Sequence, residues 1–75
     1  MENEQNNVTF ITAFEALMHG AVISKREWEN DKIYCYRKNG FATIHKEDGD
    51  HQWLISDGDM NGLDWFLTGE TVELD

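Results

Sequence analysis

Apolar residues near the N-terminus follow helical spacing. Phe14, Leu17 and Met18 would share one face of a helix, because residues three and four positions apart are neighbours on a helix surface. We therefore predict a helix over residues 13–19. Gly20 follows the last turn, where a left-handed backbone favours glycine, so we expect the helix to end there.

Two starting points for this helix fit the sequence. Thr12 and Glu15 have the spacing of a capping box, in which each side chain satisfies the backbone amide of the other residue. Alternatively, Thr9 is the cap, and Phe10 then joins the apolar face of a longer helix.

Beyond the helix, short apolar segments alternate with turn residues, a pattern typical of antiparallel strands. Asn39-Gly40 is the strongest hairpin signal, because both residues tolerate the positive φ that a type I′ turn requires. Residues 25–31 are expected to form a polar turn, and residues 56–62 a loop or one short helical turn. Strands are expected at residues 21–24, 32–38, 41–46, 51–55, 63–67 and 71–74, the last two joined by a turn at 68–70.

These elements predict an α+β domain, with one N-terminal helix packed on a small antiparallel sheet of about five strands. Residues 1–8 are expected to be a flexible N-terminus and residues 9–75 a single domain. A core of this size supplies only about 3–5 kcal/mol of net stability. Cys35 is the single cysteine, so no internal disulfide can add to this, and we expect the chain to be oligomeric.

The composition is strongly acidic, with 15 Asp and Glu residues against six Lys and Arg residues and a formal net charge of −9. Such a surface repels nucleic acids and anionic membranes, so we expect neither as a partner. The chain has no stretch of the roughly 20 apolar residues that a membrane span needs, and its first residues do not resemble a secretory signal. We therefore expect a cytoplasmic protein.

Residues that carry enzyme chemistry are sparse. Cys35 lies in the middle of an expected strand and is interpreted as a small core residue. Asp57, Asp59 and Asp64 resemble a calcium loop only in part, because Thr68 stands where such a loop has a glutamate. We expect no catalytic residue, no metal site and no cofactor.

The three tryptophans are the most informative residues for binding. Trp53 lies in an apolar stretch and is expected in the core. Trp28 lies in the polar segment KREWENDK, so it is a candidate platform for stacking a nucleobase or contacting another subunit. Arg26, two positions earlier, offers a planar fork for phosphate oxygens.

Two segments of the chain follow a recurring pattern. Residues 12–28 contain, in order, Phe14 (or Phe10 just before them), Glu15-Ala16-Leu17, Gly20, Ala21-Val22-Ile23, Arg26 and Trp28. Residues 53–65 contain Trp53, Ser56, Asp59 and Asp64-Trp65. Both segments resemble the opening and closing blocks of the Thoeris anti-defence 2 family. Ile55 stands where the family has Pro, and Asn61-Gly62 stands where it has Leu-Ala.

The resemblance implies a phage protein that assembles as a homotetramer in the cytoplasm of the host bacterium. Such proteins bind a cyclic ADP-ribose isomer, the signal of the Thoeris immune response, in pockets between subunits and sequester it without cleavage. Some members also hold cyclic dinucleotides. The residues implied as ligand contacts are Phe10 and Trp28 for stacking, Arg26 for phosphate, Ser56, Asp59 and Asp64 for polar contacts, and Trp65 as part of the wall.

Two other functions remain open from the composition. An acidic inhibitor of a host protein, such as a DNA mimic, would form a complex that salt weakens and would bind no small ligand. A structural phage protein without a pocket is the third possibility.

Overall fold

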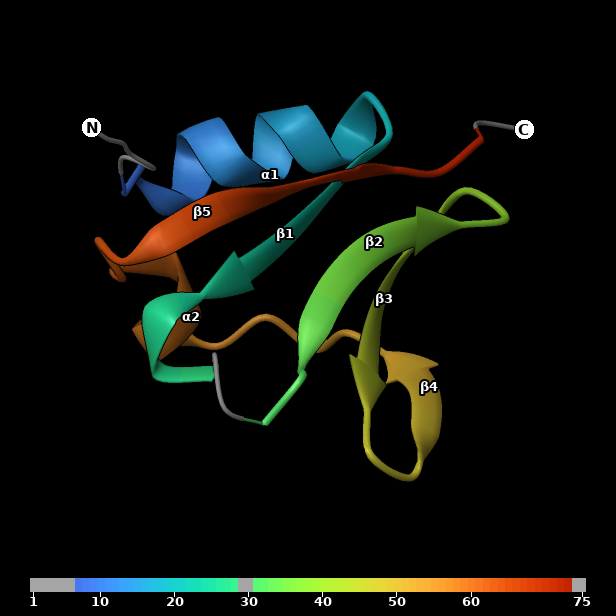
Figure 1. Ribbon diagram of the computed structural model, residues 1–75. Helices are drawn as coiled ribbons and strands as arrows, with labels where there is room; N and C mark the ends of the chain where they lie inside the picture. Colours follow the sequence, from blue (N-terminus) through green and yellow to red (C-terminus); the bar gives the residue numbers. More distant parts are fainter. Residues whose placement is uncertain (1–6, 29–30, 74–75) are drawn as a thin grey trace.

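The computed structural model describes residues 7–28 and 31–73. Its helices are α1 (Phe10–Met18), the 3-10 helix η1 (Arg26–Trp28) and α2 (Asp57–Met60). Its strands are β1 (Ala21–Lys25), β2 (Tyr34–Lys38), β3 (Phe41–Lys46), β4 (Gly49–Gln52) and β5 (Trp65–Thr71). The strands form one antiparallel sheet in the order β4-β3-β2-β1-β5, and α1 lies along the β1–β5 side of it (Figure 1). The expected α+β fold with a helix and five antiparallel strands is confirmed.

The helix α1 begins earlier than the Thr12–Glu15 capping box predicts. Thr9 is the N-cap, and its hydroxyl accepts a hydrogen bond from the Thr12 amide at 3.3 Å. Thr12 is therefore inside the helix, and the alternative start is the correct one. The reason is burial, because the earlier start puts Phe10 on the same face as the fully buried Ala13.

The N-terminal segment enters the fold before α1. Val8 forms an isolated bridge with Trp65, and its amide donates to the Trp65 carbonyl at 2.7 Å. The end of the expected flexible segment thus pairs with β5, whereas residues 1–6 lie outside the described part of the chain.

The β2–β3 hairpin forms as predicted. Asn39 and Gly40 have φ values of 54° and 85°, which is the left-handed conformation of a type I′ turn. Strand β3 has the expected limits, while β2 begins two residues later than expected, because Lys32 has a φ of 56° and belongs to the preceding turn.

Two strand predictions in the C-terminal half are wrong. Strand β4 covers residues 49–52, not 51–55, so the expected turn residues Gly49 and Asp50 belong to it. The strand expected at residues 63–67 begins at Trp65 and continues through the expected turn to Thr71, because residues 65–67 and Thr71 pair with β1. Of the strand expected at residues 71–74, only Thr71 is in a strand, and residue 74 lies outside the described residues. The pairing shifts between Ala21 and Ile23, and Gly69, with a φ of 95°, lies in the resulting irregularity and not in a turn.

The core lies between α1 and the sheet. Ile23, Cys35 and Ile44 face each other in register across β1, β2 and β3, and all three are buried. Leu17 from the helix and Trp65 from β5 complete the fully buried centre. The expectation that Cys35 is a core residue is confirmed. Burial raises the pKa of its thiol, and the nearby Asp59 charge raises it further, so the thiol stays neutral.

The opposite face of the sheet carries a hydrogen-bonded cluster around Asp50. Its carboxylate accepts from the Tyr36 hydroxyl and the Lys38 ammonium and lies 2.7 Å from Nδ1 of His45. Tyr34 stacks on the His45 ring with the ring centres 4.6 Å apart. The hydrogen bonds from Tyr36, His45 and Lys38 lower the pKa of Asp50 to about 2. The cluster therefore ties β4 to β2 and β3 through a charged carboxylate.

Candidate functional site

A cavity of about 350 Å³ lies where η1, β3, β4 and the segment before α2 meet. Its apolar walls come from Trp28, Ile33, Ile44, Trp53 and Leu54. Its polar groups come from Lys46, His51, Gln52 and Asp59. Two indoles and a few polar side chains around one concave space are typical of a small-molecule site.

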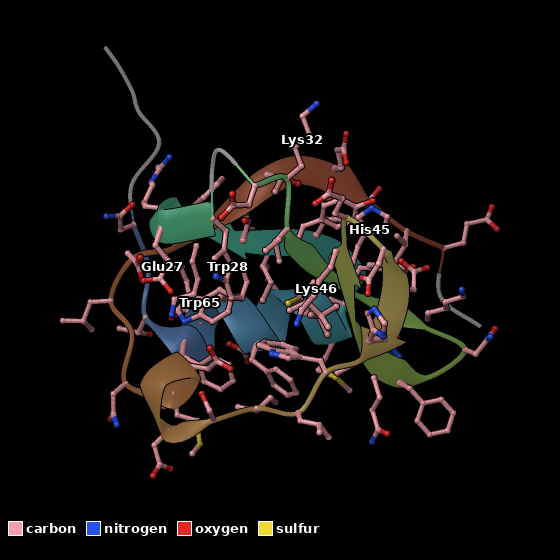
Figure 2. All side chains as sticks on the ribbon, turned by 90° about the horizontal axis from the view of Figure 1, so that it is seen from below. Glu27, Trp28, Lys32, His45, Lys46 and Trp65 are labelled. Carbon is pink, nitrogen blue, oxygen red and sulfur yellow. The ribbon has the colours of Figure 1, made fainter. Side chains whose placement is uncertain are left out.

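Trp28 is held in place from behind by the core. It meets Trp65 edge to face, with ring centres 5.4 Å apart and an interplanar angle of 88°. The η1 turn follows β1 directly, and this connection places the half-buried indole between the core and the cavity. Figure 2 shows Trp28 and Trp65 side by side, with Lys46 across from them on β3. Although the residues next to Trp28 in the sequence are polar, the fold places it against Trp65, which lies 37 positions further along the chain.

Lys25 is a buried cation beside this aromatic pair. Its side chain is 8% exposed, and its Nζ lies 5.5 Å from the centre of the Trp28 ring and 5.4 Å from that of Trp65. Nζ also lies 3.3 Å from Oε2 of Glu27 and 3.8 Å from Oδ1 of Asp59. These contacts compensate for burying the charge and connect η1 to α2.

Ser56 and Asp59 cap the N-terminus of α2. The Ser56 hydroxyl accepts from the Asp59 amide and the Asp59 carboxylate accepts from the Ser56 amide, each at 3.2 Å. This capping box starts the short helical turn that the sequence allowed for residues 56–62. Asp59 also lines the cavity, but its carboxylate is already engaged by the Ser56 amide and by Lys25. Ser56 does not line the cavity.

Phe10 and Trp65 lie in or against the core and not at the cavity. Phe10 packs on Phe14, Trp53 and Trp65 with ring centres 5.5, 5.9 and 5.7 Å away. Trp65 is 0% exposed, and its indole N–H donates to the Asp59 carbonyl at 3.0 Å. In the single chain, Trp65 therefore supports Trp28 and Asp59 from behind and offers no surface to a ligand.

Arg26 and Asp64 lie on another side of η1. The Arg26 guanidinium stacks over the Phe66 ring at 4.1 Å, and its Nε donates to the Asn7 side chain at 2.8 Å. The Arg26 amide donates to the Asp64 carbonyl at 3.0 Å. Neither residue lines the cavity. Of the seven residues singled out in the sequence, the structure brings only Trp28 and Asp59 to its wall.

Seven of the nine lining residues of the cavity were not singled out as ligand contacts, and Trp53, Lys46 and His51 are the most informative of them. Trp53 was expected in the core; it is 6% exposed, and it also lines the cavity. Lys46 follows Ile44 by two positions on β3, and His51 pairs with Ile44 across β3 and β4. Because alternate residues of a strand share a face, both side chains lie on the core side of the sheet. The alternation of side chains along β3 could therefore have placed Lys46 on the core face from the sequence alone.

A wider and shallower hollow of about 480 Å³ lies over the β2–β3 turn and β4. Among the described residues that line it, Phe41 is the only Phe, Tyr or Trp, and it is 70% exposed. A ligand there would meet one loosely held ring, whereas the cavity beside Trp28 has two indoles backed by the core. We therefore place the candidate site in the cavity beside Trp28.

The described residues contain no group of three or more His, Cys, Asp or Glu side chains arranged to hold a metal ion. In residues 7–28 and 31–73, no helix is long and apolar enough to cross a membrane.

Comparison with known proteins found neither a protein-family model nor a curated protein that matches this sequence. The cavity and its lining residues are therefore the basis for assigning a function.

Proposed function

We propose that the protein binds a cyclic nucleotide immune signal, a cyclic ADP-ribose isomer, and sequesters it without cleavage. It would act as a phage anti-defence protein in the host bacterial cytoplasm and so prevent activation of a Thoeris-type effector. The observation that carries this proposal is the cavity with Trp28 and Trp53 in its walls and the Lys46 ammonium at its rim. The resemblance of residues 12–28 and 53–65 to the Thoeris anti-defence 2 family supports it.

The aromatic walls suit a nucleobase. A base stacked on an aromatic side chain gains about 1–3 kcal/mol, and every base has a flat face for such a contact. Trp28 and Trp53 are both fixed by the core, so little side-chain freedom is lost when a ring binds. Competition with a host receptor requires nanomolar binding, on the order of −12 kcal/mol. The volume of one chain's cavity, about 350 Å³, is at the small end for a ligand of this kind.

Association of subunits would enlarge and close this site, and we propose a homotetramer. Leu54 lines the cavity and is 77% exposed, and Leu63, in the segment between α2 and β5, is 72% exposed. Exposed apolar side chains such as these, one of them in the cavity wall, are suited to cover by another copy of the chain. A shared pocket would then gain contacts that one chain lacks.

Sequestration without cleavage is supported by the chemistry of the described residues. The Cys35 thiol is buried and its pKa is raised, so it is not an available nucleophile. Two histidines lie in the sheet. His45 is hydrogen-bonded to Asp50 on the face of the sheet opposite the core, and His51 is hydrogen-bonded to Asp48 at the cavity rim.

The acidic composition does not prevent capture of an anionic ligand. At physiological salt, charges more than about 8 Å apart are largely screened, so the net charge of −9 acts weakly on a bound ligand. The groups within hydrogen-bonding distance decide the local field.

The test is to incubate the purified protein with cyclic ADP-ribose isomers, remove free ligand, denature the protein by heat and analyse the supernatant by mass spectrometry. Intact ligand should be released, and native mass spectrometry should show four chains per assembly. Hydrolysed product would contradict sequestration. A protein that binds no cyclic nucleotide, yet forms a salt-sensitive complex with a host protein, would support the acidic-inhibitor alternative.

A further inference from the structure

We propose that Lys46, assisted by His51, anchors the anionic group of the ligand, and that this role does not belong to Arg26. The inference rests on the proposed function and assigns an orientation to the ligand in the cavity. The phosphates would lie at the β3–β4 wall, and the base would lie towards Trp28.

Most of the six Lys and Arg residues already have partners within the chain. Four of them are engaged within the chain: Lys25 with Glu27 and Asp59, Arg26 with Asn7 and Phe66, Arg37 with the Met18 carbonyl, and Lys38 with Asp50. Lys46 is exposed and forms no hydrogen bond or ion pair with another described residue. Lys32 is free in the same sense, but it does not line the cavity.

The position of Lys46 also favours this role. Lys46 lies on the same face of β3 as Ile44, and His51 lies opposite Ile44 on β4, so both residues belong to one wall of the cavity. Nε2 of His51 is bound to Asp48 at 2.9 Å, which leaves Nδ1 of the ring for a ligand. Figure 2 shows Lys46 on the side of this space that faces Trp28. A ring held at Trp28 therefore has the Lys46 side chain on another wall of the same cavity.

The charges on the other sides of the cavity also favour the β3–β4 wall. Asp59 lies at the α2 end of the cavity, but the buried Lys25 ammonium 3.8 Å away offsets its charge. Lys46 also borders a neighbouring hollow, whose other lining residues are Ile33 and the acidic Asp31, Glu47 and Asp48. An anion is repelled on that acidic side and meets the Lys46 ammonium favourably only from the cavity. The arrangement thus gives one preferred place for a phosphate.

The experiment compares Lys46→Gln with Lys32→Gln, which removes the same charge from the chain outside the cavity. Wild type and both variants are titrated by calorimetry with cyclic ADP-ribose isomers and with adenosine, which has no phosphate, at low and high salt. We expect Lys46→Gln to weaken binding of the cyclic nucleotide by about 10-fold, the effect of one charge-assisted hydrogen bond. Its binding should also depend less on salt, while adenosine binding and Lys32→Gln match wild type.

A third variant, Lys46→Arg, keeps the cation and should retain most of the affinity, which separates loss of charge from loss of fold. Equal affinities of Lys46→Gln and Lys32→Gln for a nucleotide that the wild type binds would overturn this inference alone. Wild-type protein that binds none of the cyclic ADP-ribose isomers would overturn the proposed function, and this inference with it.

Discussion

Replacing Trp28 by alanine removes the aromatic wall of the cavity that is less involved in the core. Trp28 is half-buried, whereas Trp53 is 6% exposed and belongs to the buried cluster. Trp53→Ala would cost about 3–5 kcal/mol of stability, comparable to the whole net stability of so small a domain, and would confuse unfolding with loss of binding. Trp28→Ala is therefore the sharper test of the aromatic site.

The effect of Trp28→Ala on stability follows from two contacts. The edge-to-face contact with Trp65 contributes about 0.5–1.5 kcal/mol. The Lys25 ammonium, 5.5 Å from the ring centre, adds about 0.5–1 kcal/mol or more because it is buried. Together these predict a loss of about 1–3 kcal/mol and a fall of roughly 5–20 °C in Tm. The loss of one stacking platform predicts binding about 5- to 150-fold weaker.

The assay measures binding of cyclic ADP-ribose isomers by calorimetry well below the Tm of each variant, with circular dichroism to show that the variant is folded. Trp28→Phe keeps an aromatic face and should lie between wild type and Trp28→Ala. A folded Trp28→Ala protein that binds the nucleotide as tightly as wild type would refute the placement of the base at this wall.

Three further substitutions test the fold around the site. Asp50→Asn should lower stability at neutral pH: the pKa of Asp50 is lowered from 3.8 to about 2 in the folded chain, so its contribution is fully present above pH 3.8 and is lost as the pH falls through about 2. Urea unfolding at several pH values checks this, and acid profiles of equal slope for wild type and variant would contradict it. Ser56→Ala removes one bond of the capping box and should cost about 1 kcal/mol, with faster amide hydrogen exchange at Asp59; unchanged exchange there would mean that the box does not hold α2. Gly40→Ala places a Cβ in open space but at a φ of 85°, so it should cost about 1–2 kcal/mol through backbone strain alone. Gly58→Ala, inside α2 and without positive φ, is its control and should be neutral or stabilising by thermal unfolding.

Local patterns in the sequence were sufficient where neighbouring residues decide the structure. The Asn39-Gly40 turn forms because its dihedral angles depend on those two residues. For residues 56–62 the sequence allowed a loop or one short helical turn, and the turn forms because a capping box spans the four positions from Ser56 to Asp59. The buried position of Cys35 follows from alternation along one strand.

The candidate site could be predicted only in part, for a different reason. Arg26 and Lys46 are both basic residues near aromatic or apolar segments, and nothing local distinguishes them. The Arg26 guanidinium packs on Phe66, 40 positions away, whereas Lys46 lines a cavity. Which cation is free depends on partners that the chain brings together only on folding.

The sequence by itself determined an acidic α+β domain with one helix, a tight hairpin and a core of alternating strand residues, because these depend on composition and on spacings of a few positions. The tertiary structure decided that β5 continues through the expected turn at residues 68–70, because residues on both sides of it pair with β1. It also decided that Trp28 and Trp53 share a cavity and that Lys25 lies buried beside Trp65, since strand register and long-range packing bring these side chains into contact.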